Sequence, residues 1–382
     1  MKVGILTLPL WNNYGGILQS YALSNKVRGL GHETVIIDFQ HKKKSNLNNF
    51  SINLKNKMKM WFFKGKTIQV SDAIKVHISQ NTRRFVETEL GKISRPIYDS
   101  AGLYAINGEI DGVIVGSDQV WRPEYTPKYQ HYFLDFLSDD KTRISYAASF
   151  GKDDLNLPSE KIEFMSKNLS KFKSVSVREA TGLDFVHNNL GVNEAVQVVD
   201  PTFLMSKDEY IFLCDKYCDG KNNKGKIFTY ILDWNIFANK TVKSISDSLG
   251  LDTFEVKPNK IDTSFTVNDS KYIYPCVTDW LRAFRDAEFI IADSFHGCVF
   301  SIIFNKPFIA IGNKTRGLAR FNSLLETFDL QQKLVLSSED VNRVISSGLK
   351  EFDWVKINQK SDELKKESLI FLKDALSVKT LL

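Results

Sequence analysis

Few cysteines occur in this chain, and their spacing matches no metal-binding pattern. Its 382 residues include only Cys214, Cys218, Cys276 and Cys298. The first two are four residues apart on a helical stretch, and no second pair stands at the spacing of metal ligands. The pattern predicts reduced, structural thiols in a cytoplasmic protein, and no metal site is expected.

Long apolar runs are absent as well. No run reaches the roughly 18–20 residues that a membrane-spanning helix needs. The first residues, Met1–Thr7, are typical of a strand and lack the charged region, apolar core and cleavage site of a signal peptide. We therefore expect a cytoplasmic protein that is at most peripheral at the inner face of a membrane.

Two classes of partner have no motif in this sequence. No G-x-G-x-x-G dinucleotide fingerprint occurs. The net charge is only +6, and no recognised nucleic-acid motif accompanies the basic residues. We expect neither a dinucleotide cofactor nor a nucleic-acid partner.

What the chain does have is an alternation of strand and helix patterns over its whole length. A length of 382 residues exceeds what one core usually contains, and 43% hydrophobic residues is ordinary for a globular protein. The pattern predicts an α/β fold of two doubly wound, Rossmann-like domains that face a cleft in the GT-B manner. We expect these domains to span 1–205 and 206–350, followed by a helical tail over 351–382.

The expected elements follow from apolar runs and turn signals. Helices are predicted over Ile17–Leu30, Thr181–Leu190, Cys298–Phe304 and Ser361–Leu376. The predicted strands are Lys2–Thr7, Thr34–Phe39, Gly112–Val115, Arg143–Ala147, Ser174–Arg178, Gln197–Val199, Lys226–Leu232, Thr253–Val256, Phe289–Ala292, Phe308–Ile311 and Lys333–Leu336.

The most informative stretch is the polar turn after the strand Phe289–Ala292. It contains Asp293, Ser294 and His296, and Gly297 opens the apolar helix that follows. In an open α/β sheet, the turn at a strand's carboxyl end faces the ligand crevice. Because histidine titrates near neutral pH, His296 is the best candidate for proton transfer. The alternative for the other two is that they only cap the helix.

A second turn follows the first strand and opens the helix at Ile17. Gly15 and Gly16 allow close approach to the backbone, and a helix N-terminus attracts anions or hydroxyls. The turn as a whole is a candidate site for a hydroxyl-bearing acceptor, with Asn12, Asn13, Tyr14, Gly15 and Gly16 as ligands.

A third turn, Gly116–Arg122, follows the strand Gly112–Val115 and suits a sugar. The carboxylate of Asp118 accepts hydrogen bonds from hydroxyls, and the amide of Gln119 bonds in either direction. Trp121 is expected to stack on a sugar ring, and Ser117 completes the set. The alternative is a capped turn with a buried tryptophan.

An arginine ends the predicted strand Ser174–Arg178. A guanidinium at the carboxyl edge of a strand fits a bidentate carboxylate or phosphate partner. The alternative for Arg178 is a structural pair with Glu179 or another acid.

One segment, residues 39–71, breaks the alternation. It contains no acidic residue, yet it carries eight lysines among apolar side chains that include Trp61, Phe62 and Phe63. One interpretation is a solvated basic loop. The other is a surface that rests on an anionic membrane, with lysines on the headgroups and the aromatic cluster at the interface.

Taken together, these segments resemble the polysaccharide pyruvyl transferase family over most of the chain, from Gly4 to about Leu330. The resemblance implies a GT-B-like fold and transfer of pyruvate from phosphoenolpyruvate to a sugar, usually as a cyclic ketal on two hydroxyls. It is carried by Asn12–Ala22, Val115–Trp121, Tyr132–Phe136, Arg143–Gly151, Ser176–Glu179, Asp200–Leu204 and Asp293–Gly297.

The resemblance also implies roles for individual residues. Arg178 and His296 match a donor-binding arginine and a histidine of the family, with Ser294 and Gly297 beside the latter. Many members carry an arginine where this chain has Ser294, so Lys314, Arg316 and Arg320 are the candidate substitutes. His296 is the expected acid–base and Asp118 the base on the acceptor, with phosphoenolpyruvate as co-substrate and no further cofactor.

The expected acceptor is a sugar of a bacterial capsular polysaccharide or exopolysaccharide, assembled on a polyprenyl diphosphate. Two other functions remain open at this point. GT-B folds commonly contain nucleotide-sugar glycosyltransferases, and fold does not determine function. The third possibility is a non-catalytic sugar-binding protein.

Overall fold

The computed structural model describes residues 1–43, 45–62, 67–152, 154–217, 225–266, 269–312 and 317–377. Its first lobe is built on a parallel five-stranded sheet in the order β3-β2-β1-β4-β5. Apolar runs buried on both faces favour this arrangement. The strands are β1 (Lys2–Leu6), β2 (Glu33–Ile37), β3 (Lys92–Ile93), β4 (Gly112–Val115) and β5 (Thr142–Ser145).

Two short strands extend the first lobe beside β5. They are β6 (Ser176–Val177) and β7 (Val196–Gln197), which pair in parallel. Isolated bridges from Ile144 to Ser174 and from Ala148 to Val177 place β6 alongside β5. The carboxyl ends of β6 and β7 therefore lie at the same edge as those of the main sheet.

The second lobe repeats the architecture with its own parallel five-stranded sheet, in the order β12-β11-β10-β8-β9. Together the two sheets confirm the predicted α/β fold class. Its strands are β8 (Ile227–Tyr230), β9 (Thr253–Phe254), β10 (Phe289–Ala292), β11 (Phe308–Ile311) and β12 (Leu334–Val335).

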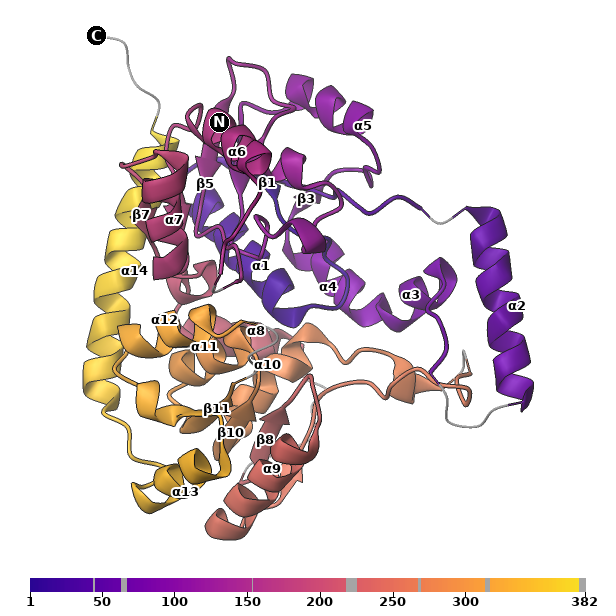
Figure 1. The fold of residues 1–382 in the computed structure, drawn as a ribbon, viewed down its shortest axis with the longest axis vertical. Coiled ribbons are helices and arrows are strands. Elements are labelled where there is room, and N and C mark those ends of the chain that lie inside the picture. Colours follow the sequence, from indigo (N-terminus) through magenta and orange to yellow (C-terminus); the bar gives the residue numbers. More distant parts are fainter. Residues whose placement is uncertain are drawn as a thin grey trace.

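Helices cover both sheets (Figure 1). The α-helices are α1 (Tyr14–Gly29), α2 (Asn46–Phe62), α3 (Asp72–Ile78), α4 (Gln80–Glu89), α5 (Ser100–Ala105), α6 (Ser159–Leu169), α7 (Ala180–Leu190), α8 (Lys207–Lys216), α9 (Ile236–Leu249), α10 (Val277–Asp286), α11 (Phe295–Ile303), α12 (Ala319–Thr327), α13 (Ser338–Ser346) and α14 (Trp354–Leu376). The short 3-10 helices are Ile106–Glu109, Pro123–Tyr125, Tyr129–Phe133, Pro201–Leu204, Ser270–Tyr272 and Gln331–Lys333.

Capping residues explain where several helices begin earlier than predicted. The side chain of Asn13 accepts from the backbone N–H of Gly16, so α1 begins at Tyr14. Asp353 caps the backbone N–H of Lys356, so α14 begins at Trp354. Both starts precede the apolar periodicity by which these helices were predicted.

The last helix, α14, joins the two lobes. It begins beside the second lobe and runs along one side of the molecule to the first (Figure 1). There the backbone N–H of Val199 donates to Ser368, and the ammonium of Lys173 donates to the carbonyls of Asp374 and Ala375. The domain limits at 205 and 350 remain predictions, and residues 218–224 lie outside the described part of the chain.

The central part of the basic segment 39–71 is helical. Helix α2 lies to the side of both lobes (Figure 1). Phe63 belongs to the residues outside the described ranges, and the side chains of Trp61 and Phe62 are likewise not described. Within the described ranges, none of the helices is both long enough and apolar enough to span a lipid bilayer.

Candidate functional site

A cavity of about 750 Å³ lies between the two lobes. From the first lobe it is lined by the turn Asn12–Gly15 and by Asp118 and Gln119. From the second it is lined by Tyr230–Leu232 and Asp293–His296. These residues follow strands in both sheets, so the carboxyl edges of the sheets face one another across this cleft, as ligand sites do in such folds.

The first-lobe wall of the cleft is held by hydrogen bonds between its two turns. Asn13, besides capping α1, donates through Nδ2 to Asp118 Oδ2 at 3.2 Å. The other oxygen of Asp118 accepts from the backbone N–H of Gln119 at 2.8 Å. A Cβ on Gly16 would lie 2.9 Å from the Asp118 carboxylate. Glycine at this position therefore leaves room for that carboxylate beside α1.

The second-lobe wall presents the start of helix α11. Ser294 caps this helix by accepting from the backbone N–H of Gly297 at 3.0 Å. Asp293 accepts from the backbone N–H groups of Leu232 and Asp233, at 2.8 and 2.9 Å. Ser294 thus caps the helix as in the alternative reading, whereas Asp293 instead holds the turn after β8, and both residues line the cleft.

His296 projects from the first turn of α11 against the first lobe. A Cβ on Gly15 would lie only 2.1 Å from His296 Nδ1, so the ring rests on the bare backbone of Gly15. Its other nitrogen, Nε2, lies 3.5 Å from Asp200 Oδ2. The imidazole is therefore held between two elements of the opposite lobe.

Asp200 is the centre of a buried cluster of polar side chains. Its Oδ2 accepts from Ser117 Oγ at 2.6 Å and pairs with Arg178 Nη1 at 3.0 Å. Its Oδ1 accepts from the backbone N–H and the hydroxyl of Thr202. Burial raises the pKa of this carboxyl, but His296, Arg178 and the bond from Ser117 together hold the pKa well below its ordinary value. Asp200 is thus a stable anion.

The guanidinium of Arg178 is only partly used in hydrogen bonds to the described residues. Only its Nη1 reaches Asp200, and within the described part of the chain neither Nε nor Nη2 has a hydrogen-bond partner. The side chain is 3% exposed, and its guanidinium carbon lies 4.2 Å from the centre of the Phe295 ring. A buried guanidinium edge with two unused N–H groups is suited to a bidentate anion.

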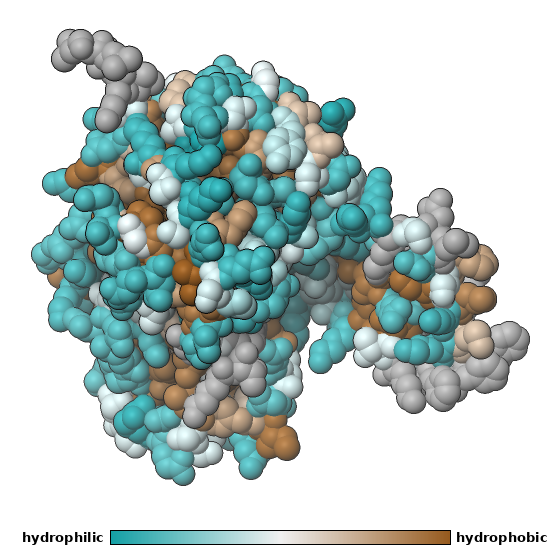
Figure 2. Space-filling model, turned by 45° about the horizontal axis from the view of Figure 1, so that its top comes forward, coloured by the Kyte–Doolittle hydropathy of each residue, from teal (hydrophilic) through white to brown (hydrophobic). Residues whose placement is uncertain are grey.

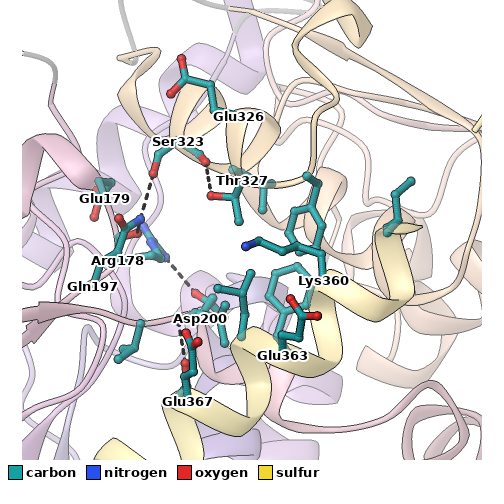
Figure 3. A pocket seen from close by; sticks show the side chains of 18 of the residues that line it. Arg178, Glu179, Gln197, Asp200, Ser323, Glu326, Thr327, Lys360, Glu363 and Glu367 are labelled. Atoms are coloured by element: carbon teal, nitrogen blue, oxygen red, sulfur yellow. Dashed lines mark hydrogen bonds and ion pairs between the residues drawn. The ribbon is translucent and has the colours of Figure 1, made fainter. Parts of the chain in front are cut away.

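That arginine lines a second cavity, of about 670 Å³, between α12, α14 and the ends of β6 and β7. In Figure 3, Arg178 and Asp200 lie at one side of it, and Lys360 extends its ammonium from α14 toward the middle. Phe295 and Arg320 line both cavities. Arg178 and His296 therefore meet at one carboxylate but open toward neighbouring spaces.

The two cavities differ in charge. Among the described residues, basic side chains of the cleft outnumber acidic ones, since Lys75, Lys257, Lys260 and Arg320 stand against Asp118 and Asp293. The second cavity has the opposite balance. Its basic residues are Arg178, Arg320, Lys356 and Lys360, and its acidic residues are Glu179, Asp200, Glu326, Asp329, Glu363 and Glu367.

Sequence comparison adds to this geometry. The chain matches the profile of a family described as Polysaccharide pyruvyl transferase over residues 13–315. This range includes the Asn13 turn, Asp118, Arg178, Asp200 and His296, and it covers well over half of the chain. The chain belongs to the polysaccharide pyruvyl transferase family. No curated protein matches it by sequence comparison.

Structural comparison shows which known folds the chain resembles. The UDP-N-acetylglucosamine 2-epimerase from Rickettsia bellii is 10% identical, with a TM-score of 0.52 over 97% of this chain and 96% of that one. The UDP-GlcNAc 2-epimerase from Methanocaldococcus jannaschii is 12% identical, with a TM-score of 0.50 over 93% and 94%. At these identities the similarity concerns the fold, which is GT-B.

Two expected acceptor ligands are out of reach, and the hydroxyl of a third is bound to the other lobe. Trp121 is 0% exposed, stacked on Phe133 and bonded to the carbonyl of Tyr132, so stacking on a sugar is corrected to a core role. Ser117 is also fully buried and bonds Asp200. Tyr14 is 2% exposed, and its hydroxyl donates to the carbonyl of Pro275 across the lobes. In each of these turns, some residues line the cleft and others face the core.

Of the three expected substitute cations, only Arg320 can be described. It lies in the first turn of α12 and lines both cavities. Lys314 and Arg316 lie outside the described residues.

Asp200 was missed as a functional residue. The family motif Asp200–Leu204 could be recognised in the sequence. The partner of the Asp200 carboxylate could not. A signal was present nevertheless: Asp200 follows the strand predicted over Gln197–Val199, as Arg178 ends the strand before it. Acid and arginine at the carboxyl ends of neighbouring parallel strands are expected to meet.

Proposed function

We propose that this protein transfers pyruvate from phosphoenolpyruvate to two hydroxyls of one sugar, forming a cyclic ketal. The observation that carries the proposal is the carboxylate of Asp200, which binds Arg178 on one side and approaches His296 on the other. An anion-binding arginine and a proton-transfer group are thereby held a few ångströms apart. Membership of the family supports the same chemistry.

The donor is expected to lie where the two cavities meet. Its carboxylate accepts from the unused Nε and Nη2 edge of Arg178, because this planar pair of donors matches a carboxylate. Its phosphate is expected near Arg320 and the first turn of α11, where backbone N–H groups precede the first intrahelical bond. Phe295, which lines both cavities, would pack against the enol between these ends.

The reaction needs proton transfer at the methylene carbon, at both sugar hydroxyls and at the departing phosphate. A proton added to the methylene carbon makes C2 electrophilic, and one sugar hydroxyl bonds to C2 while losing its proton. The C2–O bond to phosphate then breaks, and the second hydroxyl bonds to C2 and loses its proton. One proton is thereby kept in the new methyl group and one leaves with phosphate. His296, held by Asp200, is proposed to donate the first proton, a role typically worth about 10²–10⁴-fold in rate.

The acceptor is expected in the cleft. Asp118 lines it with a carboxylate already oriented by Asn13 and Gln119, and so is proposed as the base on the attacking hydroxyl. Asn12 and Gln119 line the same wall. The excess of basic side chains in the cleft fits an acceptor that carries phosphate, such as a glycan on a polyprenyl diphosphate, as used for capsular polysaccharides or exopolysaccharides.

The proposal is tested by phosphate release and by ligand stabilisation. Phosphoenolpyruvate at 100 times its dissociation constant should stabilise the fold by about 2.7 kcal/mol, whereas UDP-GlcNAc should leave the unfolding temperature unchanged. Phosphate should be released only when a suitable glycan from a panel is added. Stabilisation by UDP-GlcNAc and not by phosphoenolpyruvate would instead favour a nucleotide-sugar glycosyltransferase.

A substitution localises the donor. Arg178→Lys keeps the charge but loses the planar pair of donors, so affinity for phosphoenolpyruvate should fall about tenfold or more. The matched control is Arg84→Lys on the exposed face of α4, which should bind the donor normally. Normal affinity in the Arg178 variant would restrict this arginine to its structural pair with Asp200.

A further inference from the structure

Helix α2 presents an apolar stripe to solvent. Phe50, Leu54 and Met58 are 68%, 51% and 55% exposed. Their spacing of four residues puts them on one side of the helix. Figure 2 shows apolar surface on the part of the molecule that stands away from the main body. An exposed apolar side of a helix marks a contact with something outside the chain.

Two lysines lie along one side of that stripe. Lys55 and Lys59 follow two of its residues directly and are exposed. The whole segment 39–71 contains eight lysines and no acidic residue, in a chain whose net charge is only +6. The rest of the chain is therefore net negative, and the positive charge is concentrated where the apolar stripe is. Lysines beside an apolar helix side are typical of helices that lie on anionic lipid.

The inner side of α2 is fixed to the rim of the cleft. Asn56, which is 5% exposed, donates to the carbonyl of Gln69 and accepts from its backbone N–H, at 2.7 and 3.1 Å. Thr67 forms an antiparallel bridge to Asp262, and Ile68 lines the cleft itself. A surface that contacts the stripe would thus lie next to the entrance of the acceptor site.

We propose that α2 docks the protein on an anionic lipid bilayer, with Phe50, Leu54 and Met58 at the level of the headgroups and Lys55 and Lys59 on the lipid phosphates. The inference deepens the proposed function, because a lipid-linked acceptor is held in such a bilayer. The site is the exposed side of α2, separate from the residues that bind the donor.

The test is co-sedimentation of the full chain with vesicles. Wild type should bind phosphatidylcholine vesicles that contain phosphatidylglycerol and should not bind vesicles of phosphatidylcholine alone. Each lysine near an anionic surface is worth about fivefold in partitioning, so Lys55→Glu with Lys59→Glu should lower binding by about 25-fold or more. Replacing Phe50, Leu54 and Met58 by serine should also abolish binding, since the lysines alone lie too far from the core of the bilayer to anchor the helix.

Matched controls separate docking from general effects. Lys240→Glu with Lys243→Glu changes the same charge on the exposed side of α9, and Ile236→Ser removes an apolar side chain that is 76% exposed. Both should bind vesicles like wild type. Equal binding by the α2 variants and wild type, or equal binding of wild type to neutral vesicles, would overturn the proposal.

Activity distinguishes this inference from the proposed function. With a short water-soluble glycan, the α2 variants should release phosphate at the wild-type rate, because the donor cluster is untouched. Loss of that activity in variants with a normal unfolding temperature would overturn the assignment of α2 as a docking surface alone. If wild type bound anionic vesicles but used phosphoenolpyruvate with no acceptor, the proposed function would fail and the docking surface would stand.

Discussion

Around Asp200, opposite charges are packed together out of contact with water, whereas along α2 exposed lysines stand in a segment without any acid. The buried ions act over a few ångströms, and solvent ions hardly screen them. Each buried ion depends on the correct placement of its partner, because a lost partner leaves a desolvated charge without compensation. The lysines act collectively and at a distance, so their number matters more than their orientation. One region is built for chemistry and the other for attraction.

The largest effect is expected from His296→Ala, which removes proton transfer from the buried cluster. Phosphate release should fall by about 10²–10⁴-fold while the protein remains folded. His187→Ala on α7 is the control, because that imidazole bonds the carbonyl of Ala195 and lines neither cavity. A His296 variant that retains more than about a tenth of the wild-type rate would contradict the acid–base role.

Asp200→Asn tests the cost of breaking the buried ion pair. The free energy of unfolding should fall by about 3–5 kcal/mol, as measured by urea denaturation. Because the pKa of Asp200 in the folded chain lies below its ordinary 3.8, the ionised carboxyl stabilises the fold above about pH 4, and this stabilisation is lost as the pH falls further. The difference between variant and wild type should thus be constant from about pH 5 to 8 and shrink below about pH 4. A difference that grows on acidification would refute the assignment.

Gly15→Ala tests the position of His296 without replacing that residue. The added methyl would lie 2.1 Å from Nδ1, so the ring has to move, and displacement by about 1 Å costs up to about 100-fold in rate. The comparison is Gly29→Ala at the other end of α1, where nothing lies within 4 Å of the new methyl. Equal turnover of the two variants would mean that His296 needs no fixed position.

The smallest effect is expected from salt, which should change turnover at the buried cluster much less than vesicle binding by α2. Raising the ionic strength from about 0.15 to 1 M shortens the screening length from about 8 to 3 Å. Turnover of a soluble glycan at saturating donor should then change less than about twofold, whereas vesicle binding should be largely lost. Parallel losses of both would show that the two regions do not differ in the way described.

Much of the fold was predictable because buried strands have a local signature. Phe289–Ala292 and Phe308–Ile311 are apolar runs between polar turns, and both were predicted with the observed limits. Helix starts depended on caps such as Asp353, which lie outside the apolar pattern. The GT-B arrangement came from the order of the elements and from the family resemblance.

The sequence predicted which turns form the candidate site, but not which side chains of those turns face the cleft. Polar turns after strands pointed to the cleft, where Asp118 and His296 are found. Which side chain of a turn faces inward depends on contacts far away in sequence. Trp121 is buried by Phe133 and Tyr132, and Arg178 pairs with an acid 22 residues later. Both outcomes were alternatives at the level of sequence, and local pattern alone could not decide for them.

The contact between His296 and Asp200 joins the two lobes, because α11 belongs to the second sheet and Asp200 follows β7 of the first. Any opening of the lobes lengthens that 3.5 Å separation and lifts the imidazole off Gly15. If His296 is the proton donor that we propose, it is aligned only while the lobes are closed. Such an enzyme would be idle while open, and the enol would be protected from water until closure had assembled the site around both substrates.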